Sequence, residues 1–186
     1  MLVSLVITLV IVATIPPILQ TVQGSTTASA GISAGSAQAG LAVENIAVQV
    51  GSASQICLPT SLTLTGPTVA PGFAVRVLSL AFNKSEWVQW MVDTSTHVLE
   101  QQEWPTTWTA GNPVPSWVVV AHPVVNSVIP PFSLPSSTSG APRSLAIALY
   151  VTEAQRHTSQ PVVVKSSVAA LNTPYAASST CATSED

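Results

Sequence analysis

A serine flanked by glycines is the first feature of the sequence that could do chemistry. Gly31-Ile32-Ser33-Ala34-Gly35 matches the G-x-S-x-G pattern, in which a nucleophilic serine sits on a strained turn between a strand and a helix. Here the pattern lies in a run of small residues, behind an apolar segment for which a helix is predicted. Because chance matches are expected in a run this rich in glycine and serine, Ser33 is not interpreted as a nucleophile.

The histidines and carboxylates show no spacing typical of a catalytic or metal site. His97 and Glu100 would converge on a helix but not on the strand expected there. The carboxylates that cluster in the sequence are better explained by solvated strand faces and turns than by an acid–base pair; they are Glu86, Asp93, Glu100 and Glu103. No phosphate-binding or dinucleotide-binding fingerprint occurs. The sequence therefore predicts no enzyme, no metal site and no cofactor.

The tryptophans cluster between residues 87 and 117; they are Trp87, Trp90, Trp104, Trp108 and Trp117. On a strand, Trp87 and Trp90 point to opposite faces because side chains alternate. Filling of a β-sheet core is the favoured interpretation. An exposed face that adheres to surfaces or stacks on sugars is the alternative.

Charged side chains are scarce in this chain. They make up 7% of the 186 residues, against 47% hydrophobic residues, whereas an ordinary soluble domain has roughly 25% charged residues. The five basic residues are scattered, and phosphate binding needs a local concentration of Lys and Arg, so no nucleic-acid partner is expected. The high apolar content argues against a disordered chain.

Two cysteines and one asparagine are candidates for covalent modification. The spacing of Cys57 and Cys181 fits no zinc pattern. In an exported chain an even pair indicates one disulfide, and two free buried thiols are the alternative. Asn83-Lys84-Ser85 is the one N-x-S/T acceptor without a central proline, so Asn83 is the predicted glycosylation site.

Residues 1–19 are almost entirely apolar and contain no charged side chain. A helix of this length would span about 28 Å, close to the thickness of a bilayer core, and Pro16-Pro17 would bend it. Three interpretations stay open: a cleavable secretory signal, a membrane anchor, and a mature N-terminus left after removal of a basic leader. The first two normally carry flanking Lys or Arg, which this segment lacks. Met1 is either the initiator or a residue exposed by such cleavage.

Residues 20–43 are nearly all Gly, Ala, Ser and Thr, and the first charged side chain of the chain is Glu44. Gly31, Gly35 and Ala39 follow a small-xxx-small spacing, which lets helices approach closely. The many alanines favour a helix over the alternative, a flexible Ser/Gly linker. We therefore expect residues 1–50 to form one kinked rod with few contacts to the rest of the chain.

After Gly51, apolar runs alternate with Pro, Gly, Ser and Thr, a pattern typical of short strands and turns. Strands are predicted over 56–65, 73–82, 86–93, 96–103, 116–121, 144–152 and 161–168, with a long loop or edge over 122–143. This number of short β-branched segments indicates an antiparallel β-sandwich. The expected core residues are Val75, Val77, Leu78, Trp117, Val119, Ile147, Leu149 and Val163. The predicted fold class is α+β: a long N-terminal α-helix over 1–50, then an Ig-like antiparallel β-sandwich head over 51–186.

This combination of an uncharged apolar N-terminal segment, a small-residue extension and a β-rich head resembles the type IV pilin family, above all its archaeal adhesion pilins and archaellins. The resemblance implies a structural subunit of an extracellular cell-surface filament used for adhesion. The implied partners are the membrane before assembly, the pilus assembly machinery, and other copies of the chain. The implied polymerisation residues are Leu2, Leu5, Leu9, Val12, Gly24, Ala28, Gly31, Gly35 and Ala39.

The sequence departs from the bacterial members of that family. Position 5 is Leu5, where bacterial pilins typically carry a glutamate, and Pro16-Pro17 is unusual for a filament core. The alternative function is a membrane-anchored β-sandwich binding module, or a surface-layer or virion protein, with residues 20–50 as a flexible stalk. Under the filament hypothesis, a leucine in place of Gly35 should block assembly and leave the head folded.

Overall fold

The computed structural model describes residues 33–59, 69–109, 112–113, 115–135, 143–152 and 161–172, except for the side chain of Asn83. These residues form one α-helix over 33–51, a short 3₁₀ turn η1 (Ala81–Asn83) and eight strands. The strands are β1 (Gln55–Cys57), β2 (Ala74–Ser79), β3 (Glu86–Asp93), β4 (Val98–Pro105), β5 (Val118–Ala121), β6 (Phe132–Ser133), β7 (Ser144–Val151) and β8 (Val162–Ala169).

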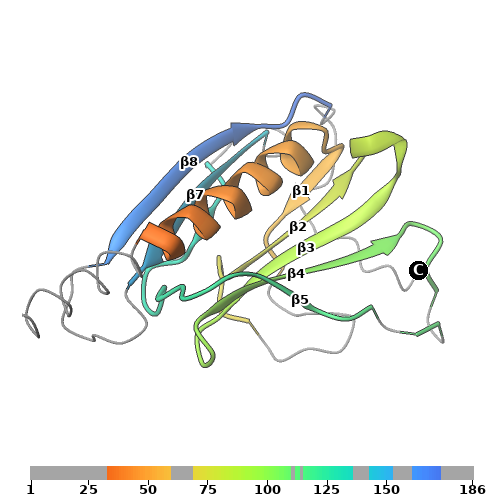
Figure 1. The fold of residues 1–186 in the computed structure, drawn as a ribbon. Helices are drawn as coiled ribbons and strands as arrows, with labels where there is room; N and C mark the ends of the chain where they lie inside the picture. Colours follow the sequence, from red (N-terminus) through yellow and green to blue (C-terminus); the bar gives the residue numbers. More distant parts are fainter. Residues whose placement is uncertain are drawn as a thin grey trace, which may run out of the picture.

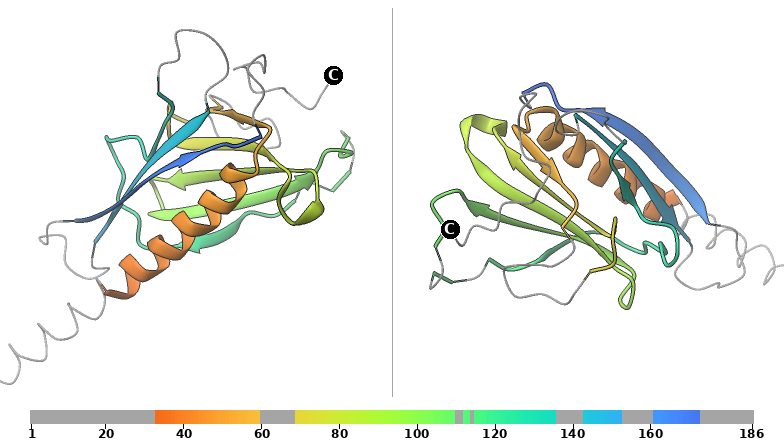
Figure 2. Two further views of the ribbon diagram at one scale, coloured as in Figure 1. Left: turned by 90° about the horizontal axis from the view of Figure 1, so that it is seen from above. Right: turned by 180° about the vertical axis from the view of Figure 1, so that it is seen from behind.

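The strands build two antiparallel sheets. The larger sheet has the order β1-β2-β3-β4-β5 and the smaller sheet the order β6-β7-β8. Figures 1 and 2 show the helix lying along the opening between the two sheets. In both sheets, strands that are neighbours in the sheet are also consecutive in the sequence.

One face of the helix is apolar or small, and this face is buried. The spacing of three and four residues places the buried side chains on a single stripe. The stripe consists of Gly35, Ala39, Ala42, Val43, Ile46, Gln49 and Val50. The opposite face, with Leu41, Glu44 and Val48, is exposed. A bond of 3.0 Å from the Ser52 hydroxyl to the Gln49 carbonyl satisfies one acceptor at the carboxyl end of the helix.

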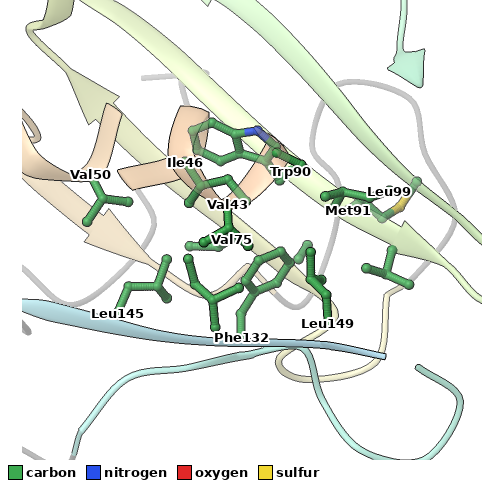
Figure 3. Packing of buried hydrophobic residues seen from close by; sticks show 14 of the residues in the cluster. Val43, Ile46, Val50, Val75, Trp90, Met91, Leu99, Phe132, Leu145 and Leu149 are labelled. Carbon is green, nitrogen blue, oxygen red and sulfur yellow. The ribbon is translucent and has the colours of Figure 1, made fainter. Parts of the chain in front are cut away.

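The buried stripe of the helix completes the hydrophobic core between the sheets (Figure 3). Val43, Ile46 and Val50 belong to the same buried cluster as Val75 of β2 and Trp90 of β3. The smaller sheet supplies Phe132, Leu145, Ile147, Leu149 and Val151 to this cluster. Burial of each large aliphatic side chain stabilises the fold by about 1.5–3 kcal/mol. The helix is therefore a structural part of the β-sheet domain.

Polar contacts fix the helix at both ends. Near its start, Gln38 Oε1 accepts a hydrogen bond of 3.3 Å from the backbone N–H of His122. In the second half, Asn45 Nδ2 donates to Gln101 Oε1 of β4 at 3.3 Å. Gln49 accepts a hydrogen bond from the hydroxyl of Ser79, which ends β2. These bonds fix the register of the helix on the larger sheet, because each joins one helix position to one position of the sheet or its loops.

The predicted α+β arrangement, in which a long N-terminal helix carries a separate Ig-like β-sandwich head, is wrong. The structure is mostly antiparallel sheet, and the helix over 33–51 is packed into the core instead of standing apart from it. The physical reason is the period of the apolar residues. Val43, Ile46 and Val50 continue the stripe that begins at Gly35 and Ala39, so the small residues approach the chain's own sheets. The predicted boundary after residue 50 falls at the end of this buried helix.

Several of the expected core residues are buried, and others are not. Val75, Val77, Ile147 and Leu149 are buried, whereas Leu78 and Trp117 are half-buried. Val119 and Val163 are exposed because the strand register, which pairs them with Glu100 and Tyr150, places them on sheet faces that point away from the core. Alternation along a strand identifies a buried face only where another layer covers that face.

The two helix glycines at positions 35 and 40 give a matched test of this packing. A Cβ on Gly35 would lie 2.7 Å from Cγ1 of Val151, whereas a Cβ on Gly40 would meet nothing within 4 Å. Gly40→Ala should raise the free energy of unfolding by about 1 kcal/mol, since alanine favours helix. Gly35→Ala should gain less or lose stability, and the larger Gly35→Leu should lose about 1–3 kcal/mol.

Denaturant unfolding of the three variants checks this expectation. Equal stabilisation by Gly35→Ala and Gly40→Ala would show that the helix does not contact Val151. The collision also means that Gly35→Leu perturbs the head itself. It therefore cannot isolate the assembly surface, contrary to the expectation from the sequence.

Candidate functional site

The face of the larger sheet that points away from the helix carries a buried row of polar side chains. Arg76, Gln89 and Gln102 are direct cross-strand neighbours on β2, β3 and β4. Arg76 is only 2% exposed, and its Nε donates to Gln89 Oε1 at 2.8 Å. Burial lowers the pKa of Arg76. Its guanidinium carbon lies 5.5 Å from the centroid of the Trp104 ring, a cation–π distance.

Tryptophans occupy the next row of the same face. Trp87 and Trp104 are cross-strand neighbours and form a second buried cluster, with Leu78 and Trp108 packed against it. Within the described part of the chain, Trp104 Nε1 has no hydrogen-bond partner although it is buried. Trp90 points the other way, into the core beneath the helix. The tryptophans of β3 and β4 therefore fill two opposite faces, and none of these three is exposed.

A cavity of about 520 Å³ lies on the other side of the polar row, where β3 turns into β4. Its apolar wall comes from Phe73, Met91 and Trp117. Asp93 and Glu100 supply carboxylates to the same cavity. The residues before Trp117 are held against the sheet, because Gln102 Nε2 donates to the Pro115 carbonyl at 2.6 Å. The cavity thus combines an aromatic wall with negative charge.

Asp93 organises the turn between β3 and β4. Its Oδ1 accepts hydrogen bonds from the Ser95 backbone N–H at 2.8 Å and the Ser95 hydroxyl at 2.6 Å, and its Oδ2 accepts one from the Thr96 hydroxyl at 2.7 Å. These side-chain hydrogen bonds, Ser95 first, lower the pKa of Asp93 to about 2. Asp93 is therefore charged at neutral pH, and its oxygens are engaged within the turn.

Glu100 is in the opposite electrostatic situation. Burial and, to a lesser extent, the negative charge of Asp93 raise the pKa of Glu100. Within the described residues no side chain or backbone group donates a hydrogen bond to its carboxylate. Glu100 is half-buried on β4 beside the aromatic wall. It is the carboxylate of this cavity that remains available to a ligand.

The other carboxylates and the serine pattern do not converge on this cavity. Oε1 of Glu86 lies 3.9 Å from Nζ of Lys84. On the helix side of the sheet, Glu103 accepts a hydrogen bond from the side chain of Gln101. Ser33 is exposed in the first turn of the described helix, where Gly31 and Ile32 lie outside the described residues. No group of three or more His, Cys, Asp and Glu side chains in the described ranges could hold a metal ion.

The residues proposed for polymerisation fall into two groups. Gly35 and Ala39 are buried, and both belong to the helix face that packs on the chain's own sheets. The others lie outside the described residues; they are Leu2, Leu5, Leu9, Val12, Gly24, Ala28 and Gly31. No helix among the described residues combines the length and the apolar composition of a membrane span.

The structure describes two of the three residues predicted to be modified, Cys57 and Asn83. Cys57, at the end of β1, is disulfide-bonded and buried. Cys181, its predicted partner, lies outside the described residues. Asn83 ends the η1 turn between β2 and β3. The cavity around Glu100 and Trp117 has no signal in the sequence, because its walls come from separate segments that only the sheet register brings together.

Comparison with known proteins gives no relative for this chain: no family model, no curated protein and no solved structure matches it.

The two cavity carboxylates should affect stability with opposite signs. The folded-state pKa of Asp93, about 2, is below its ordinary value of 3.8. The stability from its ionised form is therefore present above pH 3.8 and is lost as the pH falls through 2. Asp93→Asn should be less stable than the parent chain at pH 7, and the difference should vanish toward pH 2. Thermal melts across this pH range measure the effect.

Glu100→Gln should instead raise the melting temperature at pH 7. The raised pKa means that the charged form of Glu100 is disfavoured in the folded state. The gain should shrink as the pH falls through that raised pKa, because the parent chain then also becomes neutral. Glu44→Gln, on the exposed helix face, is the control and should change stability by less than about 0.5 kcal/mol. Destabilisation by Glu100→Gln at pH 7 would mean that Glu100 has a cationic partner in the chain.

Proposed function

We propose that this chain is the structural subunit of an extracellular, type IV pilus-like filament that adheres to surfaces. In this proposal residues 1–32 pack with the same segment of other copies, and the β-sheet domain forms the filament surface. The membrane holds the subunit before an assembly machinery extrudes it.

The observation that carries the proposal is the way the uncharged part of the chain enters the domain. Residues 1–43 contain no charged side chain. Among the described residues of this stretch, those from Gly35 to Val43 contribute their buried stripe to the core. Residues 1–19 are mostly apolar, and such a sequence is stable in lipid or against other apolar surfaces. A subunit that is held in a membrane and then polymerises needs a segment that is stable in both environments.

The helical structure of residues 33–51 supports a filament over a stalked module. In the alternative function, residues 20–50 would be a flexible stalk. The described part of that segment is helical from residue 33 and is buried along one face. A rigid connection lets the packing of one segment position the neighbouring domains in a regular array, as a helical polymer requires.

The surface of the domain also suits contact with copies. Leu41 and Val48 project from the outer face of the helix, and Leu41 is 67% exposed. Together with Phe82, which is 78% exposed, they line a hollow of about 510 Å³. Phe82 also has a positive φ of 55°, a conformation that is uncommon for a bulky residue. Large apolar side chains of this kind are typical of surfaces that another subunit covers.

A matched pair of valine substitutions tests the proposal in the full chain. Val12→Asp places a charge in the apolar segment. Val128→Asp places the same charge on the domain, where Val128 is 85% exposed. Electron microscopy of purified material should show filaments for the parent chain and for Val128→Asp, and none for Val12→Asp, because a carboxylate is unfavourable in an apolar packed interior.

The folded state of each variant is checked by its near-ultraviolet circular dichroism. Filaments of Val12→Asp equal in number to those of the parent chain would exclude residues 1–32 as the packing segment. Dispersed particles of the parent chain in detergent, with no filaments on detergent removal, would favour the membrane-anchored module.

A further inference from the structure

We propose that the cavity between Trp117 and Glu100 binds an organic ammonium group carried on a small apolar body. The site lies on the face of the larger sheet opposite the helix, so it is separate from the surface through which the helix packs. Its chemistry is independent of whether the chain polymerises.

The volume and the walls of the cavity suit a small organic ligand. About 520 Å³ is within the ordinary range for small-molecule sites. Phe73 and Met91 are buried and form an apolar floor, and Trp117 is a half-buried wall. The bond from Gln102 to the Pro115 carbonyl holds the segment before Trp117 in place. The aromatic surface is therefore preorganised before a ligand arrives.

The charge of the cavity selects a cation. Asp93 and Glu100 both line it, and no described lining residue is basic. Arg76, on the same face of the sheet, lies over Trp104 in the direction away from the cavity. Asp93 contributes a fixed negative charge because its hydrogen bonds within the turn keep it ionised. Glu100 adds a carboxylate that accepts no hydrogen bond from the described residues.

An ammonium group satisfies these features together. It would pair with Glu100, whose partial burial strengthens the attraction, and it would lie against the Trp117 ring as a cation–π contact. Its alkyl body would cover Met91 and Phe73. A neutral sugar could stack on Trp117 but would leave the negative charge of the cavity uncompensated, and an anion would be repelled by both carboxylates.

Choline and its uncharged isostere 3,3-dimethylbutan-1-ol differ in charge at nearly constant shape, so they test the proposal directly. Saturation-transfer NMR titrations of the full chain at pH 7 should show that choline binds about tenfold more tightly than the isostere. Methyl α-glucoside is the sugar probe and should bind no better than the isostere.

Three variants locate the binding. Glu100→Gln and Trp117→Ala should each weaken choline binding by at least about threefold. Glu103→Gln makes the same charge change on the same strand but on the helix side, and it should leave choline binding unchanged. Because Glu100→Gln preserves shape, it remains informative even if Trp117→Ala is poorly folded.

The following results would overturn the proposal. Equal binding of choline and its isostere would remove the role of charge. Tighter binding of the glucoside that is insensitive to Glu100→Gln would identify a sugar site instead. Equal losses in Glu100→Gln and Glu103→Gln would indicate a general effect of net charge, and binding of no probe would show that the cavity is not a ligand site.

Discussion

The burial of one helix face between two antiparallel sheets is the interaction on which the rest of this structure depends. The stripe from Gly35 to Val50 packs into one buried core with side chains of both sheets. At the start of the stripe the absence of a side chain on Gly35 admits Val151, and farther along Ile46 is fully buried in the shared core. The same contact fixes on the domain residues 35–43, the end of the uncharged N-terminal stretch.

The helix packs on one side of the larger sheet, and the buried polar side chains lie on the other side. The buried row around Arg76 divides that face into two parts, a tryptophan cluster and an acidic cavity. Few charged residues exist in this chain, yet Asp93 and Glu100 both line one cavity, where their pKa values shift in opposite directions. The helix and the acidic cavity thus lie on opposite sides of one sheet.

Local sequence patterns predicted the strands better than the arrangement of the layers. Each predicted strand segment overlaps an observed strand, because alternation and turn residues are local signals. The short β6 was missed within the predicted loop over 122–143. The predicted position of the helix was wrong. Small residues such as Gly35 allow a helix to approach closely either another copy of the chain or the sheets of its own chain, and the sequence does not distinguish the two. The cavity was not predictable, since only register brings Met91, Glu100 and Trp117 together.

Hydrogen–deuterium exchange of the full chain tests most directly whether the helix is a structural part of the domain. If residues 39–50 belong to the core, their backbone amides should exchange as slowly as those of β3 and β7, since all three would open only with the whole domain. The exposed residues Val128 and Ile129 should exchange rapidly and serve as the internal reference. Rapid exchange along residues 39–50, with β3 and β7 still protected, would contradict this account and would show a helix that docks only loosely on a sheet domain stable without it.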